Sequence, residues 1–95
     1  VSGTNISFGS AAVFENSSTF DPVAVFDSNS NKVVIAYRDG GNSSHGTSVV
    51  GTVSGTSITF GTPVVFETAA TNYLGAAFDS TANKVVFSWS DSSVE

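Results

Sequence analysis

The chain repeats itself. Residues 1–43 align with residues 53–95 at a constant offset of 52 without a gap, and 20 of these 43 pairs are identical. The longest identical runs are Val1-Ser2-Gly3-Thr4 with Val53-Ser54-Gly55-Thr56, and Asn31-Lys32-Val33-Val34 with Asn83-Lys84-Val85-Val86. A period near 50 residues is typical of repeat architectures, in which each unit buries its apolar faces against its neighbours. We therefore expect two units, residues 1–46 and 47–95.

The sequence has the pattern of short β-strands and lacks the spacing of an amphipathic helix. The predicted strands of the second unit cover residues 47–53, 57–67, 73–79 and 84–90. Between them we expect a tight turn at 54–56, a loop at 68–72 and a hairpin loop at 80–83. Gly61 and Pro63 lie inside the second strand and predict a bend there. The first unit carries the same pattern from Ile6 to Tyr37.

Residues of one parity along these strands are large and apolar, so we expect them to form the core. The predicted core residues are Phe8, Phe14, Phe26, Val33, Ile35 and Tyr37 in the first unit and Phe60, Phe66, Phe78, Val85, Phe87 and Trp89 in the second. The opposite parity is apolar too, as at Val25, Val34 and Val86, and a sheet that is apolar on both faces lies between other sheets. The sequence therefore predicts an all-β fold of two antiparallel four-stranded, blade-like sheets, the first one incomplete. They stack face to face in a propeller-like or stacked-sheet array.

Each unit runs through Val-Ser-Gly-Thr, Ile-x-Phe-Gly, Val-Phe-Glu, Phe-Asp-Ser and Asn-Lys-Val-Val. This succession resembles the blade-like tandem repeats of bacterial β-propeller and extracellular repeat proteins, over the whole chain. The resemblance implies consecutive antiparallel sheets stacked on one another. The shared residues are turn and core positions, so the resemblance concerns architecture.

The two units differ at one place. The first unit begins at the position of Val53 and so lacks the strand predicted at 47–53, which leaves an open sheet edge. If Ser93-Val94-Glu95 of one copy is followed by Val1-Ser2-Gly3 of another copy, the joined segment is similar to residues 49–55. We therefore expect other copies of the chain as partners, joined head to tail by strand pairing into a filament or a ring. A domain fragment with a frayed edge is the alternative.

The composition disfavours several partners. Only three cations stand against eight carboxylates, which gives a net charge of −5. Nucleic acids and anionic membranes need clustered Lys and Arg, so we expect neither as a partner. No apolar run approaches the ~20 residues of a membrane span, and no membrane insertion is expected. The chain has no Cys, so its redox compartment is open.

Ser and Thr supply more than a quarter of the residues. A surface of hydroxyl groups instead of charges favours an extracellular or cell-surface location, and an ordinary soluble β domain is the alternative. The chain begins at Val1 without Met, as expected of a processed product or of a segment of a longer protein.

One loop has oxygen ligands in the alternation of a calcium site. Asp27, Asn29 and Asn31 alternate with Ser, but the matching stretch keeps only Asp79 and Asn83. A hairpin loop, in which Asp and Asn side chains accept backbone N–H groups, explains both stretches better. We therefore expect no metal ion and no cofactor.

The carboxylates recur at equivalent positions, as Glu15 with Glu67, Asp27 with Asp79 and Asp39 with Asp91. Catalytic carboxylates need different environments to separate their pKa values, so carboxylates at equivalent turns and strand ends are expected to be structural. His45 is the only histidine and lies in a Gly/Ser/Asn loop without a catalytic triad around it. We therefore expect no catalytic residues.

Two features connect the chain with sugars. Asn5, Asn16 and Asn42 each begin an Asn-x-Ser sequon and are the glycosylation candidates. Tyr73 and Trp89 are the candidate sugar contacts, because Tyr73 lies near a loop and Trp89 ends a core stripe. The preferred function is a non-enzymatic, extracellular structural repeat protein that assembles head to tail by strand complementation into a fibre or surface matrix. A lectin-like β-propeller module that binds carbohydrate is the alternative.

Overall fold

The computed structural model describes residues 3–91, with the side chains of Tyr73 and Asp91 outside the description. The described chain is all-β and holds no helix, which confirms the predicted fold class. Its strands are β1 (Thr19–Asp27), β2 (Lys32–Asp39), β3 (His45–Ser54), β4 (Ser57–Phe60), β5 (Val64–Asp79) and β6 (Lys84–Asp91). All pairings between them are antiparallel.

The strands form one sheet in the order β1-β2-β3-β5-β6, and β4 pairs with β3 beside β5. The two units are thus joined in a single six-stranded sheet instead of two separate four-stranded ones. The central strand is β3, which pairs with β2 along one edge and with β5 and then β4 along the other. The break between β4 and β5 falls at residues 61–63, which confirms the bend predicted at Gly61 and Pro63.

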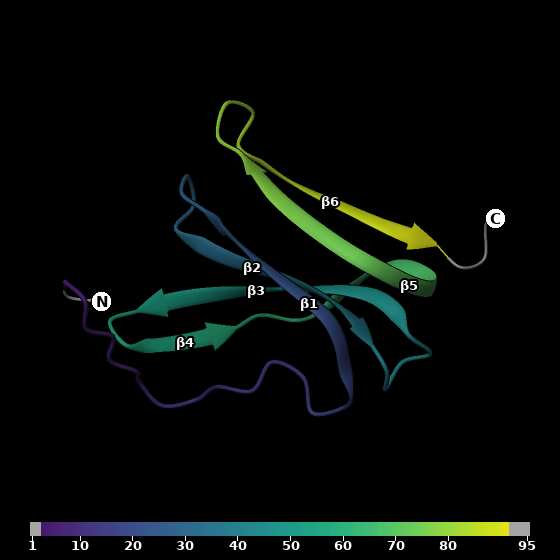
Figure 1. Ribbon diagram of the computed structural model, residues 1–95, viewed down its shortest axis with the longest axis horizontal. Helices are drawn as coiled ribbons and strands as arrows, with labels where there is room; N and C mark the ends of the chain where they lie inside the picture. The colour runs from purple at the N-terminus through teal and green to yellow at the C-terminus, as the bar shows by residue number, and fades with distance from the viewer. Residues whose placement is uncertain (1–2, 92–95) are drawn as a thin grey trace.

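β5 is long and changes partners along its length. It pairs with β3 at Val64–Ala70 and with β6 at Thr71–Asp79. This change carries the β5–β6 hairpin back over β1, with which β5 is in contact, so that the sheet curls nearly into a barrel (Figure 1). The loop predicted at 68–72 is wrong, because these residues continue β5. The Thr71 N–H donates to the Ser44 carbonyl oxygen (3.1 Å), and Thr71 is fully buried.

The β1–β2 and β5–β6 hairpins repeat each other at the offset of 52. Their ladders have the same register, beginning at Asp27↔Lys32 in one and Asp79↔Lys84 in the other. Both ladders also shift register at equivalent points, after Phe20 and after Asn72. The sequence repeat is therefore a repeat of strand pairing, including its irregularity.

The hairpin loops repeat as well. In each loop the first Asp accepts two backbone N–H groups through Oδ1. These bonds run from Asn29 and Ser30 to Asp27 (2.9 and 3.1 Å) and from Thr81 and Ala82 to Asp79 (3.0 and 3.2 Å). Asn31 and Asn83 close the loops, and both have a φ of 57°, in the left-handed region that Asn tolerates. The prediction of hairpin loops at both places is confirmed.

The core is small and lies where β2 and β3 run side by side. Ala36 and Tyr37 are fully buried, and Val49 is 1% exposed. The half-buried members of the predicted core are Phe14, Val33, Ile35, Phe60, Phe66, Phe78, Val85 and Phe87. Most of the predicted core therefore lies at least partly inside the molecule.

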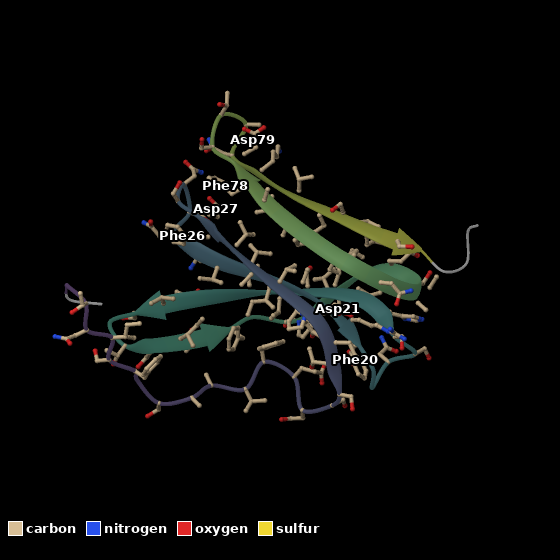
Figure 2. All side chains as sticks on the ribbon, in the orientation of Figure 1. Phe20, Asp21, Phe26, Asp27, Phe78 and Asp79 are labelled. Carbon is tan, nitrogen blue, oxygen red and sulfur yellow. The ribbon has the colours of Figure 1, made fainter. Side chains whose placement is uncertain are left out.

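Two predicted core residues are wrong, and a third is more exposed than expected. Phe8 is 87% exposed because residues 6–13 belong to no strand of the described chain and have no sheet to pack into. Phe26 is 54% exposed, at the loop end of the β1–β2 hairpin (Figure 2). Trp89 is 37% exposed, although its ring packs on Phe66.

Candidate functional site

Each of the two hairpins has two faces, because cross-strand pairs alternate between them. We call one the Phe face. It consists of Ala24, Phe26, Val33 and Ile35 in the β1–β2 hairpin and of Ala76, Phe78, Val85 and Phe87 in the β5–β6 hairpin. The other is the Val face, which consists of Val23, Val25, Val34 and Ala36 in the first hairpin and of Gly75, Ala77, Val86 and Ser88 in the second.

The two hairpins bury different faces. In the β1–β2 hairpin the Val face is covered, with Ala36 fully buried, whereas Phe26 on the Phe face is 54% exposed. In the β5–β6 hairpin the four residues of the Phe face are half-buried, whereas Val86 on the Val face is 56% exposed. Because β1 and β5 are in contact, the Val face of the first hairpin lies toward the Phe face of the second. Part of one face of each kind is left open, at Ala24 and Phe26 in the first hairpin and at Ala77, Val86 and Ser88 in the second.

Residues 5–15, which we call the acceptor segment, are the second open surface. Their counterparts 57–67 lie in β4, the bend and β5, and pair with β3. In the acceptor segment Ile6 is 63%, Phe8 87% and Val13 71% exposed, whereas Ile58 and Phe60, the counterparts of Ile6 and Phe8, are half-buried. The acceptor segment therefore exposes Ile6 and Phe8, whose counterparts are half-buried beside β3, whereas Val13 is exposed like its counterpart Val65, which is 40% exposed.

A pair of rings anchors each unit. Phe14 meets Tyr37 edge-on with ring centroids 5.2 Å apart, and the equivalent Phe66 and Trp89 lie 4.9 Å apart. Each of these Phe residues precedes a Glu that accepts a backbone N–H two residues on, from Ser17 to Glu15 (3.1 Å) and from Ala69 to Glu67 (3.2 Å). The start of the hairpin is thus fixed in the same way in both units.

A carboxyl pair lies beside the first ring pair. The carboxyl groups of Glu15 and Asp39 share a hydrogen bond, and the Tyr37 hydroxyl donates to Glu15 Oε2 (3.4 Å). Burial, and then the hydrogen bond with Glu15, raises the pKa of Asp39. The hydrogen bond from the Ser17 N–H lowers the pKa of Glu15, and burial, which acts in the opposite direction, only partly offsets this. Burial and the charge of Glu15 raise the pKa of Tyr37 to about 12.

The pKa values of the two carboxyl groups move apart, downward for Glu15 and upward for Asp39, as those of an acid and base pair do. The other bonds of the carboxyl pair are structural: Asp39 Oδ1 accepts the Gly41 N–H (3.0 Å) and so fixes the β2–β3 loop. The described residues enclose no pocket. Among them, no group of three or more His, Cys, Asp or Glu side chains could hold a metal ion. The geometry supports a role in fixing the loop.

Arg38 joins the two units. Its guanidinium lies over the Phe20 ring, 5.4 Å from the centroid, and Nη1 donates to Asn72 Oδ1 (2.9 Å). Phe20 and Asn72 are equivalent positions at the register shift of each hairpin, and Arg38 corresponds to Ser90. At this contact the two units therefore differ in sequence.

The three sequons are accessible. Asn5, Asn16 and Asn42 are exposed, in the acceptor segment, before β1 and in the β2–β3 loop. Trp89 offers part of its ring to solvent, and the Tyr73 side chain lies outside the described residues. The predicted strand completed by Ser93-Val94-Glu95 and Val1 also lies outside them. The structure brings none of the described candidates together in one site.

His45 begins β3 and faces Asp39 in the ladder, so it is a strand residue instead of the loop residue that the sequence predicted. Sequence reasoning also missed the Glu15–Asp39 pair, because it compared each carboxylate with its counterpart in the other unit. The available signal was the spacing of Tyr37 and Asp39, which places both on one face of a strand.

Comparison with protein-family models, with curated proteins and with solved structures finds no match for this chain. In residues 3–91 the structure holds no helix with the length and apolar character that a membrane crossing needs.

Proposed function

We propose that this chain is a non-enzymatic structural repeat protein that assembles head to tail with other copies of itself. The observation that carries the proposal is the burial of different faces in the two equivalent hairpins. Phe26 is left open on the Phe face at one end and Val86 on the Val face at the other. These are the two kinds of face that already meet inside the chain.

The open faces are heterologous, so a contact between them leaves another pair open. Such a contact propagates into a filament unless its rotation closes a ring. Propeller-like stacking of hairpins, copy upon copy, is the finer architecture that we propose for the assembly. The sheet of one copy would follow that of the next in the same order as the two hairpins do within the chain.

Strand pairing between successive copies would strengthen the same contact. The acceptor segment exposes Ile6, Phe8 and Val13, and in the second unit the equivalent residues lie in or beside strands that pair with β3. The β6 edge is equivalent to the β2 edge, which pairs with β3 over its full length. A strand placed between β6 of one copy and the acceptor segment of the next would complete both sheets.

The setting that we propose for this assembly is the cell exterior, as a fibre or surface matrix. The hydroxyl-rich composition and the net charge of −5 support it. The exposed Asn5, Asn16 and Asn42 are the residues that glycans would modify.

Electron microscopy of the purified chain over a range of concentrations tests the proposal. Fibres or rings of regular spacing are expected above a threshold concentration. Discrete monomers at every concentration would overturn it. The lectin-like alternative predicts saturable sugar binding on a glycan array, whereas a structural protein shows none.

A further inference from the structure

Asp21 and Pro22 form a bulge in β1, the strand at one edge of the sheet (Figure 2). The β1–β2 ladder shifts register between Phe20 and Val23, so that Asp21 and Pro22 together lie opposite Tyr37 on β2. Both residues of the bulge are exposed. The peptide bond that joins them therefore lies at the surface, outside the regular strand pairing.

The backbone of Asp21 is strained. Its φ is 50°, and among the described residues it is the only non-glycine residue with a positive φ that lies in a strand, since the other four lie in loops. A proline restricts the residue before it to extended conformations with a φ of about −120°. A non-glycine residue in the left-handed region stores strain. Breaking the bond between Asp21 and Pro22 would release that strain.

The carboxyl group of Asp21 is not held in place, whereas those of the other described aspartates are. Asp27 and Asp79 each accept two backbone N–H groups through Oδ1, and Asp39 Oδ1 accepts the Gly41 N–H. Within residues 3–91, no hydrogen bond holds the carboxyl group of Asp21. Asp21 is also the only aspartate of the chain that is followed by proline.

The second unit makes the same bulge without these two residues. Its ladder shifts register at the equivalent point, and Tyr73 and Leu74 stand where the first unit has Asp21 and Pro22. The bulge therefore requires neither a carboxyl group nor a proline. Their presence gives the bulge of the first unit a chemistry that the second unit lacks.

We propose that the chain cuts its own backbone between Asp21 and Pro22. The carboxylate oxygen of Asp21 attacks the carbonyl carbon of the same residue, and a cyclic anhydride forms as the C–N bond to Pro22 breaks. The Pro22 nitrogen leaves with the electron pair of that bond and takes up a proton from the solvent. One water molecule then opens the anhydride. The products are a chain that ends at Asp21 and a chain that begins at Pro22.

The fold favours this reaction in two ways. The nucleophile and the bond that it attacks belong to one residue, so that water is the only other reactant. Release of the backbone strain lowers the barrier in the folded chain relative to the unfolded chain.

The cut would act on one of the two contacts proposed between copies. It separates the acceptor segment from β1 in the covalent chain, while Phe26 and Val86 stay together on the larger product. Packing of Phe14 on Tyr37 and Phe60 still holds the smaller product in place. Cleavage therefore converts the acceptor segment into a part that can dissociate.

The experiment incubates the full chain at the lowest pH at which circular dichroism still shows the folded sheet, because acid supplies the proton for the departing nitrogen. A second sample is kept in urea at the same pH and temperature. Mass spectrometry over time should show two products, residues 1–21 and 22–95, whose masses add up to that of the chain plus one water molecule. We expect the folded chain to be cut about tenfold faster than the unfolded chain.

Three variants assign the cut to the bulge. Asp21→Asn keeps a residue that tolerates a positive φ but lacks the carboxylate, and Pro22→Leu introduces the residue of the second unit. Both should stay intact over the same period. Asp27→Asn is the matched control, because it removes a carboxylate elsewhere in β1, and it should be cut like wild type. A folded chain that stays intact, a cut that is no faster than in urea, or an Asp21→Asn variant that is cut like wild type would overturn the proposal.

Discussion

The equivalent residues Phe14 and Phe66 play the same part in each unit. Phe14 packs on Tyr37 and on Phe60, and Phe66 packs on Phe87 and Trp89 with centroids 5.2 and 4.9 Å away. Rings at these distances contribute both buried apolar area and edge-to-face attraction. A single aromatic residue therefore ties the start of each unit to its last strand.

Replacing Phe66 by alanine should destabilise the folded chain, and replacing Phe8 by alanine should not. Phe66→Ala should lower the free energy of unfolding by about 2 kcal/mol, below the range for a fully buried Phe because Phe66 is half-buried. Phe8→Ala should change it by less than about 0.5 kcal/mol, because Phe8 is 87% exposed. Urea denaturation of the two variants under monomeric conditions measures both. Equal costs would contradict the packing described for the second unit.

The Glu15–Asp39 pair gives stability a dependence on pH. Burial and the bond with Glu15 raise the folded-state pKa of Asp39, so the stability that its protonated form contributes is present at low pH and is lost as pH rises through that pKa. Asp39→Asn keeps an acceptor for the Gly41 N–H and a donor to Glu15 without the second charge. We expect a higher melting temperature than wild type at pH 7, with a difference that narrows toward about pH 4.

The control for this measurement is Asp21→Asn, which removes one charge at an exposed position. The difference in melting temperature between Asp21→Asn and wild type should vary less with pH than the difference between Asp39→Asn and wild type. An Asp39→Asn variant that is less stable than wild type at pH 7 would contradict the raised pKa of Asp39.

At the scale of elements, the hairpin is the unit that repeats. Both loops place an Asn at a φ of 57° and use the first Asp as the acceptor of two N–H groups. Asn31→Ala and Asn83→Ala should each destabilise the chain by about 1 kcal/mol, because alanine disfavours positive φ. The corresponding glycine variants should be close to wild type. Thermal denaturation of the four variants measures these costs, and unequal costs for the two alanine variants would contradict the equivalence of the hairpins.

The strands could be predicted from the sequence because their pattern is local. Alternating apolar residues and the Asn and Gly turns define β3, β6 and the two hairpin loops with little error. The loop expected at 68–72 is instead part of β5, because Thr71 finds a backbone acceptor in Ser44, far away in sequence. Periodicity carries no information about such a distant partner.

The candidate site was less predictable than the strands. Phe8 and Phe60 share the same pattern, yet only Phe60 lies beside β3, so equal sequences have unequal burial. The Glu15–Asp39 pair depends on the acceptor segment folding back against the end of β2. Both features follow from which strand neighbours which, and a single sequence does not state that order.

At the scale of the whole molecule, the proposed assembly makes the chain a directional unit. One end offers Phe26 and the acceptor segment, and the other offers Val86 and the β6 edge. A charged residue on either open apolar face should block that end while leaving the other intact, because an unpaired charge is costly to bury in a contact. Phe26→Lys should therefore block the contact through the Phe face, and Val86→Lys the contact through the Val face.

Sedimentation velocity of these two variants tests the head-to-tail claim most directly. Wild type should form species that grow with concentration, and each variant alone should remain monomeric. An equimolar mixture should give a 1:1 dimer and nothing larger, because each partner supplies the open face that the other lacks. A mixture that stays monomeric while wild type assembles, or a wild type that stays monomeric at all concentrations, would contradict the account.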